Sequence, residues 1–244
     1  MGMPKVGKSL WLSNLAAQSV RNGHNVAVIT LEMSDRKYIK RLGANLLGIP
    51  VSDYGNHAED QGSIKKKIGS ITYDNLKVPG KLFVKEFPTS QASTLDIERY
   101  LRKVEETKGI KFKVVVVDYI NIMKNWRNPN SENTYMKIKQ IAEDLRGVAM
   151  ANEWSVITAT QTKQSDFDSS DLSISSAAES SGLVATVDGM FGIIQDPIMY
   201  ANKEYKLKLV ANREEGYKNS YKMFNADYNH MRVMEDPNTP IHIE

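Results

Sequence analysis

Hydrophobic and polar positions follow two different periods along this chain, and the periods predict its secondary structure. Short segments rich in apolar and β-branched residues predict strands, and VVVV followed by Asp118 is the strongest signal of a buried parallel strand. The four segments of this kind are Asn25–Leu31, Lys81–Phe87, Lys113–Asp118 and Trp154–Thr160. Segments with apolar residues every three or four positions predict helices. These are Lys8–Asn22, Ser34–Leu47 with Ser34 as the N-cap, Thr94–Lys108 and Thr134–Asn152.

The rest of the chain predicts loops and short strands. Within Gly48–Pro79, a polar segment with Asp53, Gly55, Asn56 and Gly62 favours a loop, whereas the basic cluster Lys65–Lys67 favours a solvated helix face. Gln164–Ser176 is rich in Ser and Asp, which favours a loop. Four short alternating segments near the C-terminus predict strands joined by turns: Met190–Ile194, Tyr205–Ala211, Tyr217–Asn225 and His230–Met234. We therefore expect an α/β fold with a mainly parallel sheet flanked by helices and an antiparallel C-terminal extension. No repeat or linker divides residues 1–244, so we expect a single domain.

The composition is that of an ordinary globular chain. Of 244 residues, 41% are hydrophobic and 25% charged, and no apolar run is long enough for a transmembrane helix or a signal segment. The absence of cysteine excludes disulfides and thiolate metal sites and favours a reducing cytoplasm. A net charge of +3 is only weak evidence for a nucleic-acid partner.

The first residues carry the most specific motif. Gly2–Ser9 reads G-x-x-x-x-G-K-S, the phosphate-binding P-loop of nucleotide hydrolases. Glycines allow the backbone to wrap a phosphate, the lysine supplies a positive charge, and the serine hydroxyl can bind Mg²⁺. We expect ATP and Mg²⁺ as ligands, held by Gly2, Pro4, Lys5, Val6, Gly7, Lys8 and Ser9. Because a buried strand normally precedes such a loop, we expect that strand to be missing from this sequence.

Three polar residues follow predicted strands. Ligands of open α/β sheets bind beyond the carboxyl ends of the strands, so Glu32, Asp118 and Gln161 are expected near the P-loop. Asp118 closes an apolar strand, as in the Walker B motif, and can hold Mg²⁺. Glu32 can accept a proton from the attacking water, although a carboxylate that starts a helix is an alternative. Gln161 can donate to the γ-phosphate or be an ordinary solvated amide.

Several segments together resemble one family. Thr30–Ser34, Val117–Met123 and Thr158–Thr162 resemble the S-L-E-M, D-Y-L-Q-L-M and S-Q motifs of DnaB-type replicative helicases. Ala178–Asp188 is similar to the E-S-x-G-L-x-A-T-x-D stretch of the T-even phage branch, and Asn212-Arg213 to a K-N-R segment near the family's C-terminal end. These matches run in order over almost the whole chain.

The resemblance implies a RecA-like P-loop NTPase fold and a role in DNA replication. It implies a homo-hexameric ring around single-stranded DNA, with ATP between neighbours and hydrolysis driving 5′→3′ translocation. Glu32 corresponds to the catalytic base, Asp118 to the Mg²⁺ carboxylate and Gln161 to the sensor. Arg213 corresponds to the arginine finger inserted into the neighbour's site.

Further expectations follow from the same resemblance. DNA contacts are expected from Lys124, Arg127 and Lys163, whose charges would bind phosphates without sequence preference. Primase and a helicase loader are possible partners, no membrane is involved, and a phage-encoded protein would work in the host cytoplasm. The family's N-terminal domain and linker are expected to be missing from this sequence, which predicts weak hydrolysis and a mainly monomeric state in dilute solution.

Other interpretations stay open at this point. A RecA- or RadA-like recombinase shares the P-loop, the glutamate and Walker B, but the D-Y-I-N-I-M segment and the segment ending at Asp188 argue against it. A catalytically silent nucleotide-binding module is a third possibility. A small-molecule kinase is less favoured, because no arginine-rich lid segment is found.

Overall fold

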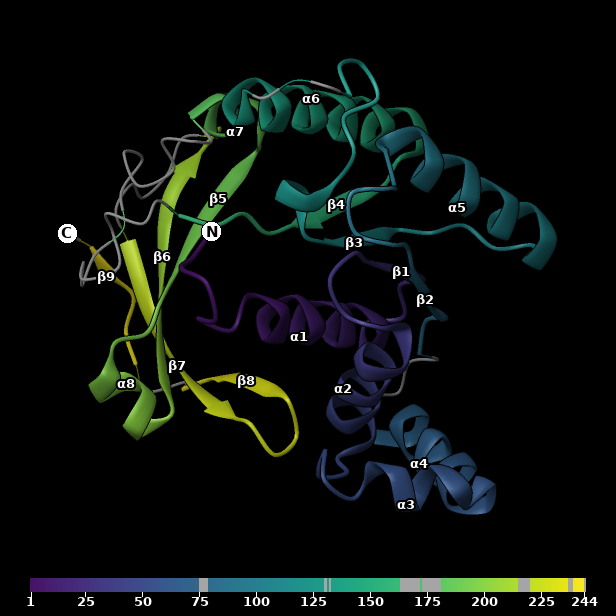
Figure 1. Ribbon diagram of the computed structural model, residues 1–244. Coiled ribbons are helices and arrows are strands. Elements are labelled where there is room, and N and C mark those ends of the chain that lie inside the picture. The colour runs from purple at the N-terminus through teal and green to yellow at the C-terminus, as the bar shows by residue number, and fades with distance from the viewer. Residues whose placement is uncertain are drawn as a thin grey trace.

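The chain forms a parallel β-sheet, covered by helices, and an antiparallel β-sheet at one side of it (Figure 1). This computed structural model describes residues 1–74, 79–129, 131, 133–162, 172, 181–214, 220–236 and 239–243. The parallel sheet has the order β2-β1-β3-β4. Its strands are β1 (Val26–Thr30), β2 (Leu82–Glu86), β3 (Val114–Asp118) and β4 (Ser155–Thr158).

Helices cover both faces of the parallel sheet, which explains why its central strands are apolar throughout. Every residue of β1 and β3 is buried. Because side chains alternate along a strand, Ala27 and Ile29 pack with α5 (Thr94–Lys108) and α6 (Thr134–Asn152). Val26 and Val28 instead pack with the helices of the opposite layer, α1 (Lys8–Arg21) and α2 (Asp35–Leu47).

The antiparallel sheet has the order β5-β6-β7-β8, and β9 pairs with β7. Its strands are β5 (Gly189–Ile194), β6 (Glu204–Asn212), β7 (Ser220–Asp227), β8 (Arg232–Glu235) and β9 (His242–Ile243). Helix α1 also contacts this sheet, since the Trp11 ring lies edge-on to Tyr205 at 5.8 Å and to Phe224 at 5.1 Å. A single helix therefore packs against both sheets (Figure 1).

The two sheets meet at the start of the chain. Gly2 forms parallel bridges with Gln161 after β4 and with Ile193 of β5. Its N–H donates to the Thr160 carbonyl at 3.2 Å, and the Ile193 N–H donates to the Met1 carbonyl at 2.8 Å. Met1 and Gly2 thus lie where a strand leading into the P-loop would join the two sheets.

The strands and helices expected from periodicity are confirmed, and so is the helix face at Lys65–Lys67, but the loop expected within Gly48–Pro79, around Asp53–Gly62, is wrong. This stretch contains α3 (Tyr54–Glu59) and α4 (Gln61–Asp74). Ile64 and Ile68 are one turn apart on α4, and α4 packs against α2. Tertiary packing stabilises these helices although their glycines weaken the local signal.

Three other short elements were not expected: η1 (Ile120–Ile122), α7 (Ser181–Thr186) and α8 (Pro197–Asn202). Helix α8 does carry a start signal, because Asp196 accepts from the Met199 N–H and Pro197 follows it. The loop expected over Gln164–Ser176 lies outside the described residues except for Leu172. None of the helices in the described ranges combines the length and hydropathy of a membrane span.

Candidate nucleotide-binding site

The P-loop lies at the carboxyl edge of the parallel sheet and leads directly into α1. Lys5 and Gly7 have positive φ angles of 64° and 94°, so the backbone curls before the helix starts. Gly7 caps α1 without a side-chain hydrogen bond. The first N–H groups of the helix are therefore available to an anion, as in phosphate-binding loops.

Lys8 folds back over this loop. Its ammonium group donates to the carbonyls of Gly2 at 3.2 Å and Met3 at 2.8 Å, and the residue is only 8% exposed. Burial lowers the pKa of Lys8 to about 8, while Glu32 and Asp118 act in the opposite direction. The lysine therefore lies near both carboxylates that the sequence analysis selected.

Asp118 ends β3 opposite Thr30 of β1 and is 1% exposed. Burial raises the pKa of Asp118, and the Glu32 charge adds to this, whereas the nearby Ser9 hydroxyl, Arg41 and Lys8 lower it. Neither Asp118 carboxylate oxygen has a hydrogen-bond partner among the described residues. A buried, unpaired carboxylate beside a serine hydroxyl is a donor set that suits a hard cation such as Mg²⁺.

Glu32 follows β1 and is exposed. The preceding residue, Leu31, donates its N–H to the Asp118 carbonyl at 2.9 Å, which holds the end of β1 against β3. The charge of Glu32 acts on Lys8, Asp118 and Tyr119. Glu32 thus lies at the same edge as the P-loop, with its carboxylate open to solvent.

Gln161 is brought to the P-loop by its bridge with Gly2. Its amide nitrogen donates to the Tyr119 hydroxyl at 3.0 Å, and its backbone N–H donates to the Asn121 side chain at 3.4 Å. The sequence analysis did not select Tyr119, Asn121 or Arg41 as site residues. For the first two, the available signal was their place in the Val117–Met123 motif, one and three residues after Asp118.

Arg213 lies far from the P-loop of its own chain. It follows β6, six residues beyond Leu207, which pairs with Ile193 beside Gly2. At about 3.4 Å per residue this separation is about 20 Å. The guanidinium donates to the Ala185 carbonyl at 3.0 Å and lies 3.7 Å from the Asp188 carboxylate. It contributes nothing to the site in cis.

The three residues expected to contact DNA differ in their surroundings. Lys124 is exposed after η1. The Arg127 guanidinium is paired with Asp144 and lies 3.6 Å from Glu143, both on α6. Lys163 lies outside the described residues. Lys124, unlike Arg127, forms no ion pair with a carboxylate among the residues that the structure describes.

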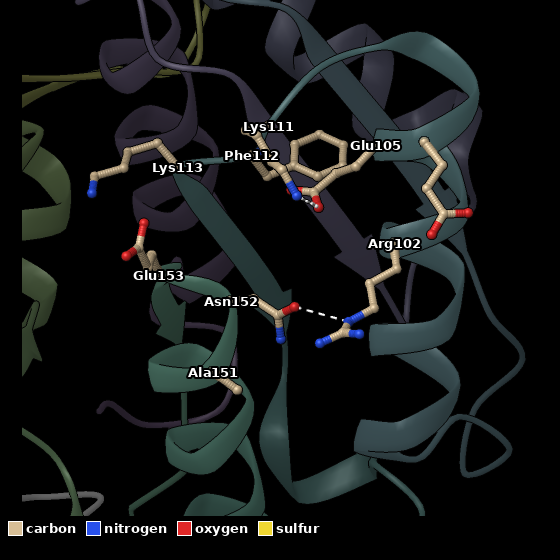
Figure 2. A pocket seen from close by; sticks show the side chains of 9 residues that line it. Arg102, Glu105, Lys111, Phe112, Lys113, Ala151, Asn152 and Glu153 are labelled. Carbon is tan, nitrogen blue, oxygen red and sulfur yellow. Dashed lines mark hydrogen bonds and ion pairs between the residues drawn. The ribbon is translucent and has the colours of Figure 1, made fainter.

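A separate pocket of about 520 Å³ lies at the opposite edge of the sheet (Figure 2). Lys113, just before β3, and Glu153, just before β4, belong to its lining. Arg102 donates to the Asn152 side chain at 2.9 Å, and the buried Glu105 accepts from Lys111 and from the Phe112 N–H. Its central polar groups are thus paired within the chain, and it takes no part in the nucleotide site.

Comparison with known proteins decides the family. Residues 1–224 match the family model of the DnaB-like helicase C terminal domain. The chain belongs to this family. The DnaB-like replicative helicase of Enterobacteria phage T4 is 35% identical over 224 residues, covering 90% of this chain and 46% of the phage protein. The replicative DNA helicase DnaB of Helicobacter pylori strain J99 is 22% identical, covering 96% of this chain and 46% of that protein.

Two solved structures confirm the RecA-like α/β fold of this DnaB-like chain. A DnaB-like replicative helicase, described with its interactions with primase, has a TM-score of 0.75 at 19% identity and covers 96% of this chain and 55% of that one. A second structure, described as an ATPase domain, has a TM-score of 0.76 at 18% identity, covering 96% of this chain and 82% of that one. The DnaB-like chain spans about half the length of the curated relatives it matches.

Proposed function

We propose that this chain is the ATP-hydrolysing motor domain of a replicative DNA helicase and couples hydrolysis to 5′→3′ movement along single-stranded DNA. One observation carries the proposal. The end of β3 and the segment after β4 bring the buried Asp118 and the half-buried Gln161 to the P-loop, and the negative charges of Glu32 and Asp118 act on Lys8 of that loop. Membership of the DnaB-like family makes a helicase motor the best-supported use of such a site.

The residues present fit a magnesium nucleotide. Asp118 and Ser9 would hold Mg²⁺, since the carboxylate is buried without a partner and the hydroxyl is close to it. No group of three or more His, Cys, Asp or Glu residues that could hold a metal ion by themselves is found in the described ranges. The bound ion would neutralise phosphate charge. Lys8 would exchange its contacts with the Gly2 and Met3 carbonyls for phosphate oxygens.

Three side chains would act on the γ-phosphate. Glu32, exposed at the end of β1, would orient the attacking water and accept its proton. Gln161 would donate an amide hydrogen to the γ-phosphate. Arg213 would act on the site of a neighbouring subunit in a homo-hexamer, which requires it to leave its contacts with Ala185 and Asp188. A site shared in this way makes the neighbour necessary for rapid hydrolysis.

Single-stranded DNA is the proposed track, with Lys124 as the best-placed described contact. Arg127 would first have to exchange Asp144 and Glu143 for phosphate, and Lys163 keeps its expected role. Because the contacts would be to phosphates, binding should weaken with salt and show little sequence preference. Primase and a helicase loader are proposed partners, and the host cytoplasm is the proposed place of action.

The decisive experiment compares the wild-type chain with Lys8→Ala and Glu32→Gln. The wild-type chain at high concentration should bind ATP in the presence of Mg²⁺ and hydrolyse it faster with single-stranded DNA. Lys8→Ala should lose nucleotide binding. Glu32→Gln should keep it but lower turnover by at least about 100-fold, because the general base is removed.

Glu106→Gln is the matched control, since Glu106 is an exposed glutamate of α5 beside the opposite pocket. It should bind and hydrolyse ATP as the wild type does. Full DNA-stimulated turnover by Glu32→Gln would exclude Glu32 as the base. Strand exchange between homologous DNA molecules, in place of unwinding of a forked substrate, would indicate a recombinase instead.

A further inference from the structure

Tyr119 lies between the Gln161 amide and the Lys8 ammonium, the two groups that would contact the terminal phosphate. It directly follows Asp118 and is 8% exposed. Its hydroxyl accepts a hydrogen bond from the Gln161 amide nitrogen at 3.0 Å, and the Lys8 ammonium lies 6.0 Å from its ring centroid. The Walker B segment therefore contacts the sensor and the P-loop lysine through one side chain.

The backbone of Gln161 is held from the same segment. Asn121 accepts from the Gln161 N–H at 3.4 Å and from the Thr160 hydroxyl at 3.0 Å. The neighbouring Thr162 N–H donates to the Gly2 carbonyl at 3.3 Å. With its backbone fixed in this way, the freedom left to Gln161 is the rotation of its side chain, and the Tyr119 hydroxyl limits that rotation.

We propose that Tyr119 is a positioning residue that holds the Gln161 amide ready for the γ-phosphate. An amide nitrogen carries two hydrogens, so one can stay on the Tyr119 hydroxyl while the other is donated to a phosphate oxygen. Without the hydroxyl, Gln161 would have to be ordered at the moment of binding, which weakens the contact. The inference rests on the proposed function, because it assigns Gln161 to a nucleoside triphosphate.

The test measures how strongly the chain prefers a triphosphate to a diphosphate. The probes are ADP and adenylyl imidodiphosphate, a non-hydrolysable ATP analogue, each titrated with Mg²⁺. Tyr119→Phe keeps the ring beside Lys8 and removes only the hydroxyl. It should leave the affinity for ADP unchanged and reduce the preference for the analogue by about 3- to 10-fold, the usual effect of one lost hydrogen bond.

Tyr100→Phe is the matched control. Tyr100 of α5 packs edge-on against Phe87, which follows β2, and its hydroxyl has no hydrogen-bond partner in the described part of the chain. It should change neither affinity. In a Gln161→Ala background, Tyr119→Phe should have no further effect, because its only action is through the amide.

Each outcome decides the matter. An unchanged preference in Tyr119→Phe, or an effect that persists at full size without Gln161, would overturn the inference. An equal loss of ADP and analogue affinity would also overturn it, because that would be a general defect of the P-loop. A wild-type chain that prefers the analogue but never hydrolyses ATP would contradict the proposed function alone, since the preference still reports on Tyr119.

Discussion

Gly7 illustrates how backbone geometry fixes a residue of the site. Residues other than glycine rarely adopt its φ of 94°. A Cβ added there would also lie 2.4 Å from the Tyr205 hydroxyl. Tyr205 is 1% exposed and packs against Trp11, so it has little room to move. The glycine is therefore required both for the turn of the P-loop and for the contact between that loop and β6.

Gly7→Ala should accordingly lower the free energy of unfolding by about 2 kcal/mol or more, from strain and displacement of Tyr205. Gly147→Ala is the control, since a Cβ there meets no atom within 4 Å. Gly147 is exposed on α6, so its replacement should stabilise the chain by about 0.5–1 kcal/mol. Urea denaturation followed by circular dichroism measures both. Equal stability of Gly7→Ala and the wild type would contradict the steric argument.

Residue positions near the P-loop could be predicted where a motif and a strand end coincide. On this basis the sequence predicted that Lys8, Asp118 and Gln161 lie near one another, as they do in the structure. The sequence did not predict the Tyr119–Gln161 hydrogen bond, because the two residues are 42 positions apart and no local pattern links them. The pairing of Arg127 with Asp144 was missed for the same reason.

Among the elements, helices with a strong cap and an apolar stripe could be predicted from sequence, and polar helices without these signals could not. Helix α5 has both signals, with Ile97 and Leu101 buried and a capping box between Ser93 and Asp96. Helices α3 and α4 have polar, glycine-containing sequences and form through contact with α2. Such contacts are non-local, so periodicity alone misses them.

The capping box of α5 predicts a pH-dependent effect of Asp96→Asn. The Ser93 hydroxyl and backbone N–H lower the pKa of Asp96 below its ordinary value of 3.8, so folding stabilises the ionised form. That contribution is complete above the unfolded-state pKa and is lost as the pH falls through the folded-state pKa. Asp96→Asn should cost about 1 kcal/mol near pH 7 and progressively less below pH 3.8.

Urea unfolding of Asp96→Asn and the wild type at neutral and acidic pH measures this difference. Glu106→Gln, an exposed change in the same helix, should show no comparable loss at neutral pH. A stability difference that stays constant as the pH falls below 3.8 would show that the carboxylate charge of Asp96 is not what caps α5.

At the scale of the whole molecule, the alternation of strands and helices was enough to predict an α/β fold with an antiparallel extension. The strand order and the meeting of the two sheets at Gly2 were not predictable, because strand pairing depends on contacts far apart in the sequence. The same architecture places the expected arginine finger away from the other expected catalytic residues of its own chain. Glu32 and Lys8 lie at the carboxyl edge of the parallel sheet, whereas Arg213 follows the last residue of β6 in the antiparallel sheet.

The central claim is that the ATP site is completed by Arg213 of a neighbouring subunit, and a mixing experiment tests it directly. Glu32→Gln and Arg213→Ala are assayed for DNA-stimulated ATP hydrolysis separately and as an equimolar mixture. Each alone should be nearly inactive. The mixture should exceed the sum of the two, because some sites then combine an intact Glu32 with an intact Arg213. A mixture no more active than its components, or wild-type turnover by Arg213→Ala alone, would contradict the account.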